Sequence, residues 1–238
     1  PRFYLTVVWN GQWFKWENRN TNFLYGQPDG GPTHDAPQNG YLNRSRVSLD
    51  YIPRDNNHPY RPAIIFRMAE AYLSYAEALN ESSERMSHKQ EILDNLNKIR
   101  HRAGIAEYGT GTDENGFTRI KINFSDQKEV RRLIHKERRV EFVGEGVRYH
   151  DLRRWKTAHY GIGNLNEQGE NPDWGVNGPD YGMNYYGTEY TDQGDNAFFK
   201  RTKYMDRVYP RKFYWYPIHQ SEIDKDPTLV QGPFWLGE

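Results

Sequence analysis

The sequence predicts a mainly α-helical protein with helical hairpins, long irregular loops and short β-hairpins. Apolar residues recur at helical spacing over 64–81 and again over 87–104. A third stretch, 137–155, places acids and bases alternately along what its periodicity indicates is a helix. The remaining segments are rich in Gly, Pro and Asn, which interrupt regular structure.

Composition excludes several classes of function. The 238 residues carry 32 basic and 32 acidic side chains, so the formal net charge is zero. A neutral chain lacks the basic surface that nucleic acids and anionic membranes attract, and we expect neither as a partner. Cysteine is absent, which excludes disulfides, thiolate metal sites and a cysteine nucleophile. No cofactor or metal site is expected, since His34 and His58 have no second ligand at metal-binding spacing.

The first 16 residues predict a β-hairpin. Two aromatic runs, 3–9 and 12–16, flank Asn10-Gly11, a dipeptide that supplies the positive φ angles of a type I′ turn. A flat indole ring can stack on the C–H face of a sugar, while polar neighbours bind the hydroxyls. The hairpin is therefore a candidate saccharide platform, with packing of its rings on the helices as the alternative. Its tryptophans are Trp9, Trp13 and Trp16.

Residues 17–62 are rich in loops, with one possible strand at 41–49. The first helix follows over 64–81, where two alanines on the apolar face allow a neighbouring helix to approach closely. The predicted buried residues of this helix are Ile65, Ala69, Tyr72, Ala76 and Leu79.

The second helix begins at a capping box formed by Ser87 and Gln90 and ends at Gly104, a suitable C-terminal cap. Together the two helices form a hairpin over 64–104. The predicted buried face of the second helix consists of Ile92, Leu96, Ile99 and Ala103.

The third helix begins after Asp126, which caps its first turn. It is expected to run over 127–145. Gly144 and Gly146 weaken it there and predict a kink or break before a continuation over 147–157.

Two carboxylates, Glu137 and Glu141, share a helix face with Val130 and Ile134, so they point toward packed surface. Two carboxylates one helical turn apart are separated by about 6 Å along the helix axis. This is close to the roughly 5 to 9.5 Å between the paired catalytic carboxyl groups of glycoside hydrolases. The alternative is a structural salt-bridge network. We favour the network, because interleaved arginines lower carboxylate pKa values whereas a general acid needs a raised pKa. Its predicted members are Glu137, Arg138, Glu141, Glu145, Arg148, Asp151, Arg153 and Arg154.

Residues 158–200 form a long loop rich in Gly, Asn and aromatic residues. A loop of this length in a compact protein is usually functional or disordered, and this one carries too many aromatic residues for disorder. It is the second candidate for ligand binding. Its candidate rings are Trp174, Tyr185 and Tyr186.

Four stretches carry a recognisable pattern. The first consists of Glu137-Arg138, Glu141-Phe142, Glu145-Gly146-x-Arg148 and Asp151-Leu152-Arg153-Arg154-Trp155. The second and third are 67–81 and 96–104, and the fourth is Tyr216-Pro217-Ile218 with Glu222-Ile223 and Leu229-x-Gln231. In order and spacing they resemble the signature of the SusD/RagB family. Two departures, His219 and Gly232, concern only local turns.

The resemblance implies a SusD-like fold with tetratricopeptide-like helical hairpins. It makes 1–238 the C-terminal portion of a single SusD-like domain, with a helical hairpin at 64–104, a signature helix at 126–157 and a loop-rich closing segment at 158–238. It also implies a surface-exposed lipoprotein of the bacterial outer membrane. The lipid-bearing cysteine is expected in an N-terminal portion that this chain lacks.

The function implied by the resemblance is non-catalytic binding of a glycan or other nutrient. The bound nutrient would be delivered to a SusC-like TonB-dependent transporter during polysaccharide utilisation. Because the family places ligand-binding aromatic residues before the first helix of this chain, Trp13 and Trp16 rank first. Two alternatives are a glycoside hydrolase that uses a carboxylate pair and a helical-repeat scaffold that binds peptides.

Overall fold

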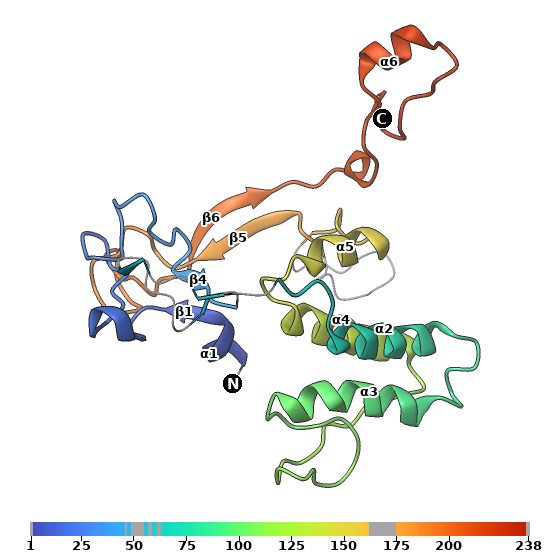
Figure 1. Cartoon of the computed structure of the whole chain (residues 1–238), viewed down its shortest axis with the longest axis horizontal. Coiled ribbons are helices and arrows are strands. Elements are labelled where there is room, and N and C mark those ends of the chain that lie inside the picture. The colour runs from blue at the N-terminus through green and yellow to red at the C-terminus, as the bar shows by residue number, and fades with distance from the viewer. Residues whose placement is uncertain are drawn as a thin grey trace.

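The computed structural model describes residues 2–45, 47–48, 55–56, 59–60, 63–161 and 175–236. Figure 1 shows two lobes joined by a long β-ribbon, with the C-terminal segment projecting from one end. The helical lobe comprises residues 67–157. The loop lobe comprises residues 2–45 together with residues 183–200, so it is assembled from two segments that lie far apart in the sequence.

Three helices form the core of the helical lobe: α2 (Met68–Glu81), α3 (Lys89–Arg102) and α4 (Gln127–Glu141). The helix α2 packs against both of the others. Removing a large apolar side chain from water stabilises the fold by about 1.5 to 3 kcal/mol. The almost completely buried side chains of this core are Leu73, Ala76, Ile92, Leu96, Ile99, Val130 and Ile134.

The helix α2 begins four residues later than predicted. Arg67 has an extended backbone (φ −140°, ψ 153°) and serves as the N-cap, so residues 64–66 precede the helix. The prediction that Ile65 joins the buried face is wrong, because its side chain is 97% exposed. The other predicted positions of this face lie inside the helix.

The predicted capping box of α3 is also wrong. The Ser87 hydroxyl donates to the Glu84 carbonyl (2.8 Å), and His88 is the N-cap, with no side-chain hydrogen bond to a backbone N–H of the first turn. The predicted C-terminal cap is confirmed. Gly104 has φ +63°, its N–H donates to the His101 carbonyl (3.0 Å), and the Ile105 N–H donates to the Arg100 carbonyl (3.2 Å).

Asp126 caps α4 as predicted. Its carboxylate accepts from the N–H groups of Lys128 (2.9 Å) and Glu129 (3.2 Å). The helix ends at Glu141, four residues earlier than expected. The predicted break is confirmed, since Gly144 and Gly146 have φ angles of +79° and +82° before the chain resumes as α5 (Val147–Arg154).

Within the described residues the strands form three two-stranded antiparallel ribbons. The pairs are β1 (Val7–Trp9) with β4 (Tyr41–Asn43), β2 (Trp13–Phe14) with β3 (Arg19–Asn20), and β5 (Gly178–Gly182) with β6 (Thr202–Arg207). Short helical segments complete the described chain: α1 (Arg2–Thr6), η1 (Lys15–Glu17), η3 (Arg211–Tyr214) and α6 (Gln220–Lys225). Among the helices of the described ranges, none has both the length and the apolar character needed to cross a membrane.

The predicted hairpin of residues 3–9 with 12–16 is wrong, because the strands around Asn10-Gly11 choose other partners. Gly11 has the predicted positive φ (+90°), but its N–H donates to the Thr21 carbonyl (2.9 Å). The buried Asn10 amide oxygen accepts from the Phe23 N–H (2.6 Å), and the Thr21 hydroxyl donates to the Trp9 carbonyl (2.7 Å). These contacts hold the turn against residues 21–23 instead of folding β2 back on β1.

Residues 178–182, inside the predicted loop of 158–200, form a strand instead. They supply β5, whose Gly178 and Pro179 are poor strand formers. Pairing with β6 satisfies its backbone, and a register shift falls between Asp180 and Tyr181. A two-stranded ribbon has two edges, which is where proline is tolerated.

Candidate ligand-binding site

The β2–β3 ribbon is anchored in the loop lobe by one arginine. The Arg19 guanidinium donates two hydrogen bonds to Asp29 (2.6 and 2.8 Å) and one to Glu17 (2.8 Å). The hydrogen bonds from Arg19 hold the pKa of Asp29 below its usual range. Asp29 also accepts from the Asn22 N–H (2.8 Å), so the ribbon and the following loop are fixed to each other.

Trp13 extends from this anchored ribbon with 58% of its surface exposed. Its cross-strand neighbour is Asn20, which is exposed as well. Directly opposed side chains of an antiparallel pair lie on the same face, with Cβ atoms about 4.5 to 5.5 Å apart. The ribbon therefore presents an open indole ring beside an amide that can both donate and accept hydrogen bonds.

Trp16 lies on the neighbouring η1 turn and is half-buried. Its ring stacks on Phe14 with centroids 5.9 Å apart and an interplanar angle of 24°, and the Lys15 ammonium lies 5.4 Å from its centroid. Because successive strand residues point to opposite faces, Phe14 and Trp13 lie on opposite faces of β2. Trp13 and Trp16 are therefore near each other in the sequence, but the structure does not place their rings on the same face of the ribbon.

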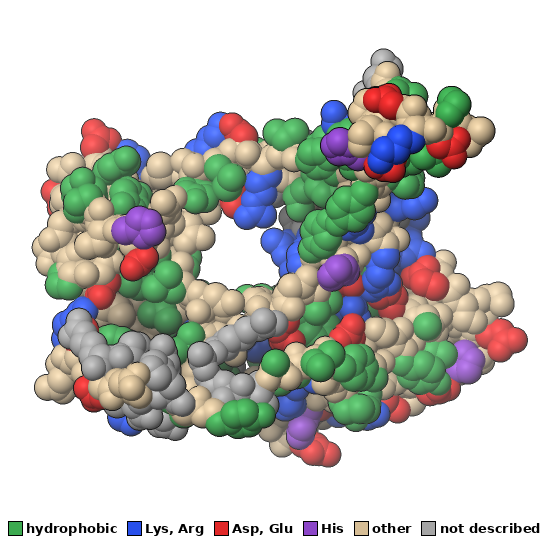
Figure 2. Space-filling model, turned by 45° about the horizontal axis from the view of Figure 1, so that its top comes forward, with side chains coloured by type: hydrophobic (Ala, Val, Ile, Leu, Met, Phe, Trp, Pro, Cys, Tyr) green, Lys and Arg blue, Asp and Glu red, His purple; other side chains and the backbone are tan. Residues whose placement is uncertain are grey.

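Trp9 belongs to the separate β1–β4 ribbon. Its ring packs against Tyr4 (centroids 4.9 Å apart) and Phe3 (5.8 Å), and the residue is half-buried. Trp9 therefore has less free surface for a ligand than Trp13. Figure 2 shows hydrophobic side chains at the surface of the loop lobe, on the left, and numerous charged ones over the helical lobe.

The later aromatic loop packs into the same lobe. Tyr185 and Tyr186 have ring centroids 6.1 and 5.5 Å from Tyr25, and the Tyr25 N–H donates to the Gly187 carbonyl (2.8 Å). Tyr186 is 70% exposed, whereas Tyr185 is half-buried. Trp174 lies outside the described residues.

Tyr25 is a site residue that sequence reasoning missed. It stands alone between Leu24 and Gly26 in an irregular segment, so no periodicity marks it. Only the long-range pairing with the later loop places it beside Tyr185 and Tyr186.

Glu137 is buried in the salt-bridge cluster of α4, and its arginine partners come from far along the chain. It pairs with Arg100 on α3 and with Arg2 on α1 (2.9 Å), and the Tyr108 hydroxyl donates to it (3.3 Å). The expectation that neighbouring arginines of the same stretch would pair with it is wrong. Consecutive residues on a helix point in directions about 100° apart, which turns Arg138 away.

Glu141, one turn later, is paired in the same way. It accepts from Arg67 (2.5 Å), immediately before α2, and from Arg102 at the end of α3. Burial alone raises the pKa of Glu141, but the hydrogen bonds from Arg102 and Arg67 outweigh burial and lower it. Arg67 also pairs with Glu145 (2.7 Å).

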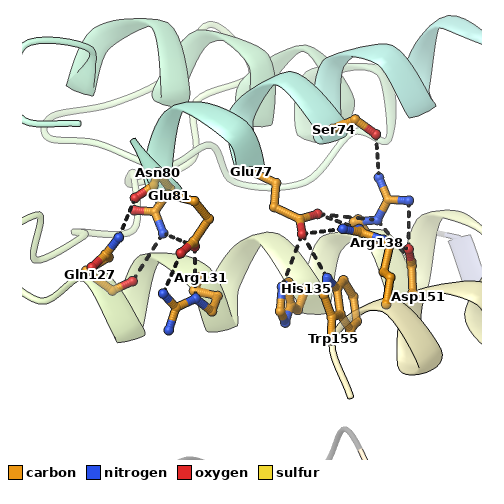
Figure 3. A network of polar contacts seen from close by, with 11 residues as sticks. Ser74, Glu77, Asn80, Glu81, Gln127, Arg131, His135, Arg138, Asp151 and Trp155 are labelled. Atoms are coloured by element: carbon orange, nitrogen blue, oxygen red, sulfur yellow. Dashed lines mark hydrogen bonds and ion pairs between the residues drawn. The ribbon is translucent and has the colours of Figure 1, made fainter. Parts of the chain in front are cut away.

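A second cluster lies between α2, α4 and α5 (Figure 3). Arg138 donates to both oxygens of Asp151 (2.9 and 3.0 Å) and to the Ser74 hydroxyl (3.0 Å). Arg154 makes a bidentate pair with Glu77 (2.6 Å for each bond), and the Trp155 indole N–H donates to the same carboxylate (2.8 Å). Sequence reasoning missed Glu77, which lies on the α2 face that meets α4.

Two further predicted members of the network are Arg153 and Arg148. Arg153 donates to the carbonyls of Phe213 (2.5 Å) and Tyr214 (2.6 Å) instead of to a carboxylate, so its predicted role in the salt-bridge network is wrong. Arg148 lies half-buried in the first turn of α5.

These clusters are suited to holding helices together. Glu137 and Glu141 are both buried among guanidinium groups, and for Glu141 these groups hold the pKa below its usual range, which keeps this carboxyl ionised instead of preparing it to donate a proton. Within the part of the chain that the structure describes, no group of three or more His, Asp and Glu residues is arranged to hold a metal ion.

A groove of about 1060 Å³ lies between α3 and residues 107–124. Two of its aromatic rings are covered by cations. The Lys98 ammonium is 4.5 Å from the Tyr72 ring, and the Arg100 guanidinium is 4.2 Å from the Tyr108 ring. These rings are less available for stacking than Trp13.

Comparison with known proteins identifies the family. The SusD family model matches residues 1–235. SusD-like proteins P25 and P38 of Formosa agariphila are each 32% identical to the chain, over 109 and 103 residues. These matches cover 46% and 43% of this chain but only 18% and 19% of the relatives, so the chain matches less than a fifth of their length.

Solved structures of SusD-like proteins superpose on almost the whole of this chain. A SusD-like protein of Bacteroides fragilis superposes with a TM-score of 0.66 at 26% identity, covering 99% of this chain and 39% of that one. A SusD-like carbohydrate-binding protein of the same species gives a TM-score of 0.62 at 22% identity, covering 97% and 41%. The predicted mainly α-helical fold and the family resemblance are thus confirmed. The chain belongs to the SusD family.

Proposed function

We propose that this chain is part of a cell-surface protein that binds a glycan or another nutrient without altering it. The observation that carries the proposal is the open Trp13 ring on an anchored ribbon, with the Asn20 amide beside it. Membership of the SusD family and the carbohydrate binding named for one structural relative support it.

The physical basis is stacking on a surface that is already ordered. An aromatic side chain buries 150 to 250 Å² when it is fully covered, so a sugar ring on Trp13 removes apolar area from both partners. The bonds from Arg19 to Asp29 and Glu17 hold the ribbon before the ligand arrives. Little conformational freedom is then lost on binding, which favours affinity.

The other aromatic candidates rank below Trp13. The Tyr25–Tyr186 pair is the second candidate, because Tyr186 is open and lies in the same lobe. Trp16 and Trp9 follow, since each already packs against a neighbouring ring. Trp174 stays a candidate ligand-binding residue on the basis of the sequence alone.

We also propose delivery of the bound nutrient to a SusC-like TonB-dependent transporter, with attachment to the outer membrane through a lipidated N-terminal cysteine. Both rest on the family resemblance. The glycoside hydrolase alternative is disfavoured, because Glu137 and Glu141 are buried among Arg2, Arg67 and Arg100. A general acid needs a raised pKa at an accessible position.

Affinity electrophoresis of the purified protein in gels containing starch, xylan or pectin tests the site. Trp13→Ala is expected to raise the dissociation constant obtained from the gel retardation about tenfold, because loss of one stacked ring removes roughly 1.4 kcal/mol of binding free energy. The matched control is Trp215→Ala, an exposed tryptophan of the C-terminal segment, which should bind like the wild type. Equal retardation of Trp13→Ala and wild type, or no retardation of the wild type in any gel, contradicts the proposal.

A further inference from the structure

A second pocket lies outside the loop lobe, between α5 and the end of β6. It has a volume of about 400 Å³. Leu152 and Ala158 are buried residues of its wall, and Met205 lines it from β6. Two aromatic rings, Tyr149 and Tyr209, also line it, and Tyr149 is 47% exposed. Its volume falls near the lower end of the range of ligand pockets, roughly 300 to 1,000 Å³.

One guanidinium holds both rings of this pocket. Arg153 donates to the hydroxyl of Tyr149 (2.9 Å) and to that of Tyr209 (3.2 Å). Since the same group also donates to the Phe213 and Tyr214 carbonyls, its own position is fixed from several sides. The two rings therefore keep their relative positions without a ligand.

The backbone around the pocket is held by a second polar side chain. The Asn177 amide donates to the carbonyls of His159 (2.6 Å) and Tyr209 (3.3 Å), and the Tyr209 N–H donates back to Asn177. These bonds join the chain after α5 to the chain after β6. The walls that the two segments supply are thus ordered in advance, which lowers the cost of binding.

Ion pairs stand beside the apolar wall. Met205 and Arg207 are two residues apart on β6 and share one face of the strand. Both line the pocket, and the Arg207 guanidinium pairs with Asp180 on β5. Asp206 lines the pocket as well and pairs with Lys203 (2.5 Å). The two ion pairs offer donors and acceptors without net charge, which suits a neutral ligand rich in hydroxyl groups better than an acid or an amine.

We propose that this pocket is a second carbohydrate subsite that accepts one neutral sugar ring. The Arg153 guanidinium lies over one side of the Tyr149 ring (5.2 Å from its centroid), so the sugar would contact the other side of Tyr149 together with Tyr209. The Arg207–Asp180 pair would bind the hydroxyls of the sugar. The inference rests on the proposed carbohydrate binding and adds a position for it.

The arrangement has a consequence for long ligands. The β5–β6 ribbon runs from the loop lobe to α5 in Figure 1, so the two sites lie at its opposite ends. A polysaccharide that reaches both sites binds the second one at a high effective concentration. Long chains should therefore bind more tightly than oligosaccharides that fill a single site.

Methionine methyl signals report on the pocket directly. The sequence has four methionines, Met68, Met86, Met183 and Met205, and only Met205 lines this pocket. The protein, labelled with ¹³C at methionine methyls, is titrated with maltohexaose, xylohexaose, cellohexaose and mannohexaose. At least one of these probes should shift the Met205 signal saturably, while Met68 and Met86, both exposed, stay still. If none of the four moves Met205, the proposal is overturned.

Variants separate this site from the first one. Tyr149→Ala should raise the apparent Kd read from Met205 about tenfold, whereas Tyr149→Phe, which keeps the ring, should stay close to wild type. Arg207→Ala changes only a partly exposed pair and should also weaken binding, which provides a test should Tyr149→Ala fail to fold. Wild-type binding by both Tyr149→Ala and Arg207→Ala overturns the proposal.

Trp13→Ala distinguishes the two ideas. If it leaves the Met205 titration unchanged, the subsite is independent of the Trp13 platform. If Trp13→Ala abolishes the Met205 shift while Tyr149→Ala and Arg207→Ala keep it, the pocket is not a subsite and the proposed function still stands. If Tyr149→Ala reduces binding and Trp13→Ala does not reduce it in any assay, the subsite stands and the proposed Trp13 site is wrong.

Discussion

At the scale of single residues, the helical lobe depends on buried carboxylates that each meet an arginine from another segment. Glu77, Glu137 and Glu141 are buried and ion-paired. A buried pair adds little net stability relative to an apolar packing, yet removal of one partner costs about 3 to 5 kcal/mol because the other charge stays buried. Their role is therefore to fix which helices meet and in which register.

Glu77 gives a test with a defined pH dependence. Burial by itself raises the pKa of Glu77, but the nearby His135 ring (3.8 Å) and hydrogen bonds from Arg154 and Trp155 outweigh burial and hold the pKa below the ordinary value of 4.5. The folded-state pKa is thus lower than the unfolded-state pKa. Its stabilising contribution is complete above about pH 5 and is lost as the pH falls through the folded-state pKa.

Glu77→Gln should accordingly lower the free energy of unfolding at pH 7 by about 3 kcal/mol. The difference from wild type should shrink as the pH is lowered below the ordinary carboxyl value, measured by urea denaturation between pH 7 and pH 3. The control is Glu81→Gln, one turn along the same helix, whose pair with Arg131 is partly exposed and worth about 0 to 1 kcal/mol. Equal stabilities of the two variants at pH 7 would refute this account.

At the scale of elements, the sequence predicted the existence of the helices better than their ends. The apolar periodicity that predicts α2, α3 and α4 reflects the core itself, where Leu96 and Ile134 are fully buried. The start of α2 depends instead on Arg67, whose guanidinium reaches across to Glu141. A local pattern at 64–66 contains no information about that distant partner, so Ile65 was placed on the wrong side of the boundary.

Strand pairing was predicted less well for the same reason. Asn10-Gly11 does form a turn, with the Gln12 N–H donating to the Trp9 carbonyl (3.2 Å). The register after the turn is decided by Thr21 and Phe23, which lie about ten residues further along. Turn residues specify a local reversal, whereas the choice between two nearby strands depends on buried polar groups outside the turn.

The break between α4 and α5 offers a matched pair of glycines. Gly144 and Gly146 both have positive φ angles, so alanine at either position is strained by roughly 1 to 2 kcal/mol. A Cβ at Gly144 would also lie 2.2 Å from the Asn43 amide nitrogen and 2.6 Å from the Ser45 hydroxyl, whereas at Gly146 it meets open space. Gly144→Ala should therefore lower the thermal melting temperature clearly more than Gly146→Ala. Identical melting temperatures would show that the approach to β4 is unimportant.

At the scale of the whole molecule, side chains from one lobe fix the position of another. Arg2 on α1 reaches Glu137 on α4, and Gly144 closely approaches Asn43 on β4. These contacts connect the loop lobe to the helical lobe at the α4–α5 break. The signature stretch is therefore the place where segments distant in sequence meet.

The candidate site shows the same limit of prediction. Sequence reasoning identified Trp13 and Tyr186 as ligand-binding candidates from aromatic content, but treated their two segments as separate. The lobe that holds both is built by long-range backbone bonds, such as Met183 N–H to Asn39 carbonyl (3.0 Å) and Tyr25 N–H to Gly187 carbonyl (2.8 Å). Backbone hydrogen bonds of this kind do not depend on side-chain type, so the amino-acid composition of the two segments does not predict them.

The C-terminal segment is attached to the body through Arg153, which contacts the Phe213 and Tyr214 carbonyls as well as the hydroxyls of Tyr149 and Tyr209. A guanidinium presents five donors in a planar fork, which lets one side chain serve several partners. An ammonium is a compact point charge and cannot reach four acceptors in this arrangement. The neighbouring Arg154 acts elsewhere, on Glu77 and Asp151.

Arg153→Lys and Arg154→Lys should therefore loosen different parts of the molecule, as measured by hydrogen–deuterium exchange. In Arg153→Lys, amides of residues 209–216 should exchange at least about tenfold faster, a change equivalent to roughly 1.4 kcal/mol in local opening. Amides of α2 and α4 should keep their wild-type rates. In Arg154→Lys the pattern should reverse, because a lysine cannot reproduce the bidentate pair that Glu77 makes beneath Trp155. Wild-type exchange of residues 209–216 in Arg153→Lys would mean that the aromatic contacts of Tyr209, Phe213 and Tyr214 hold the segment without the guanidinium.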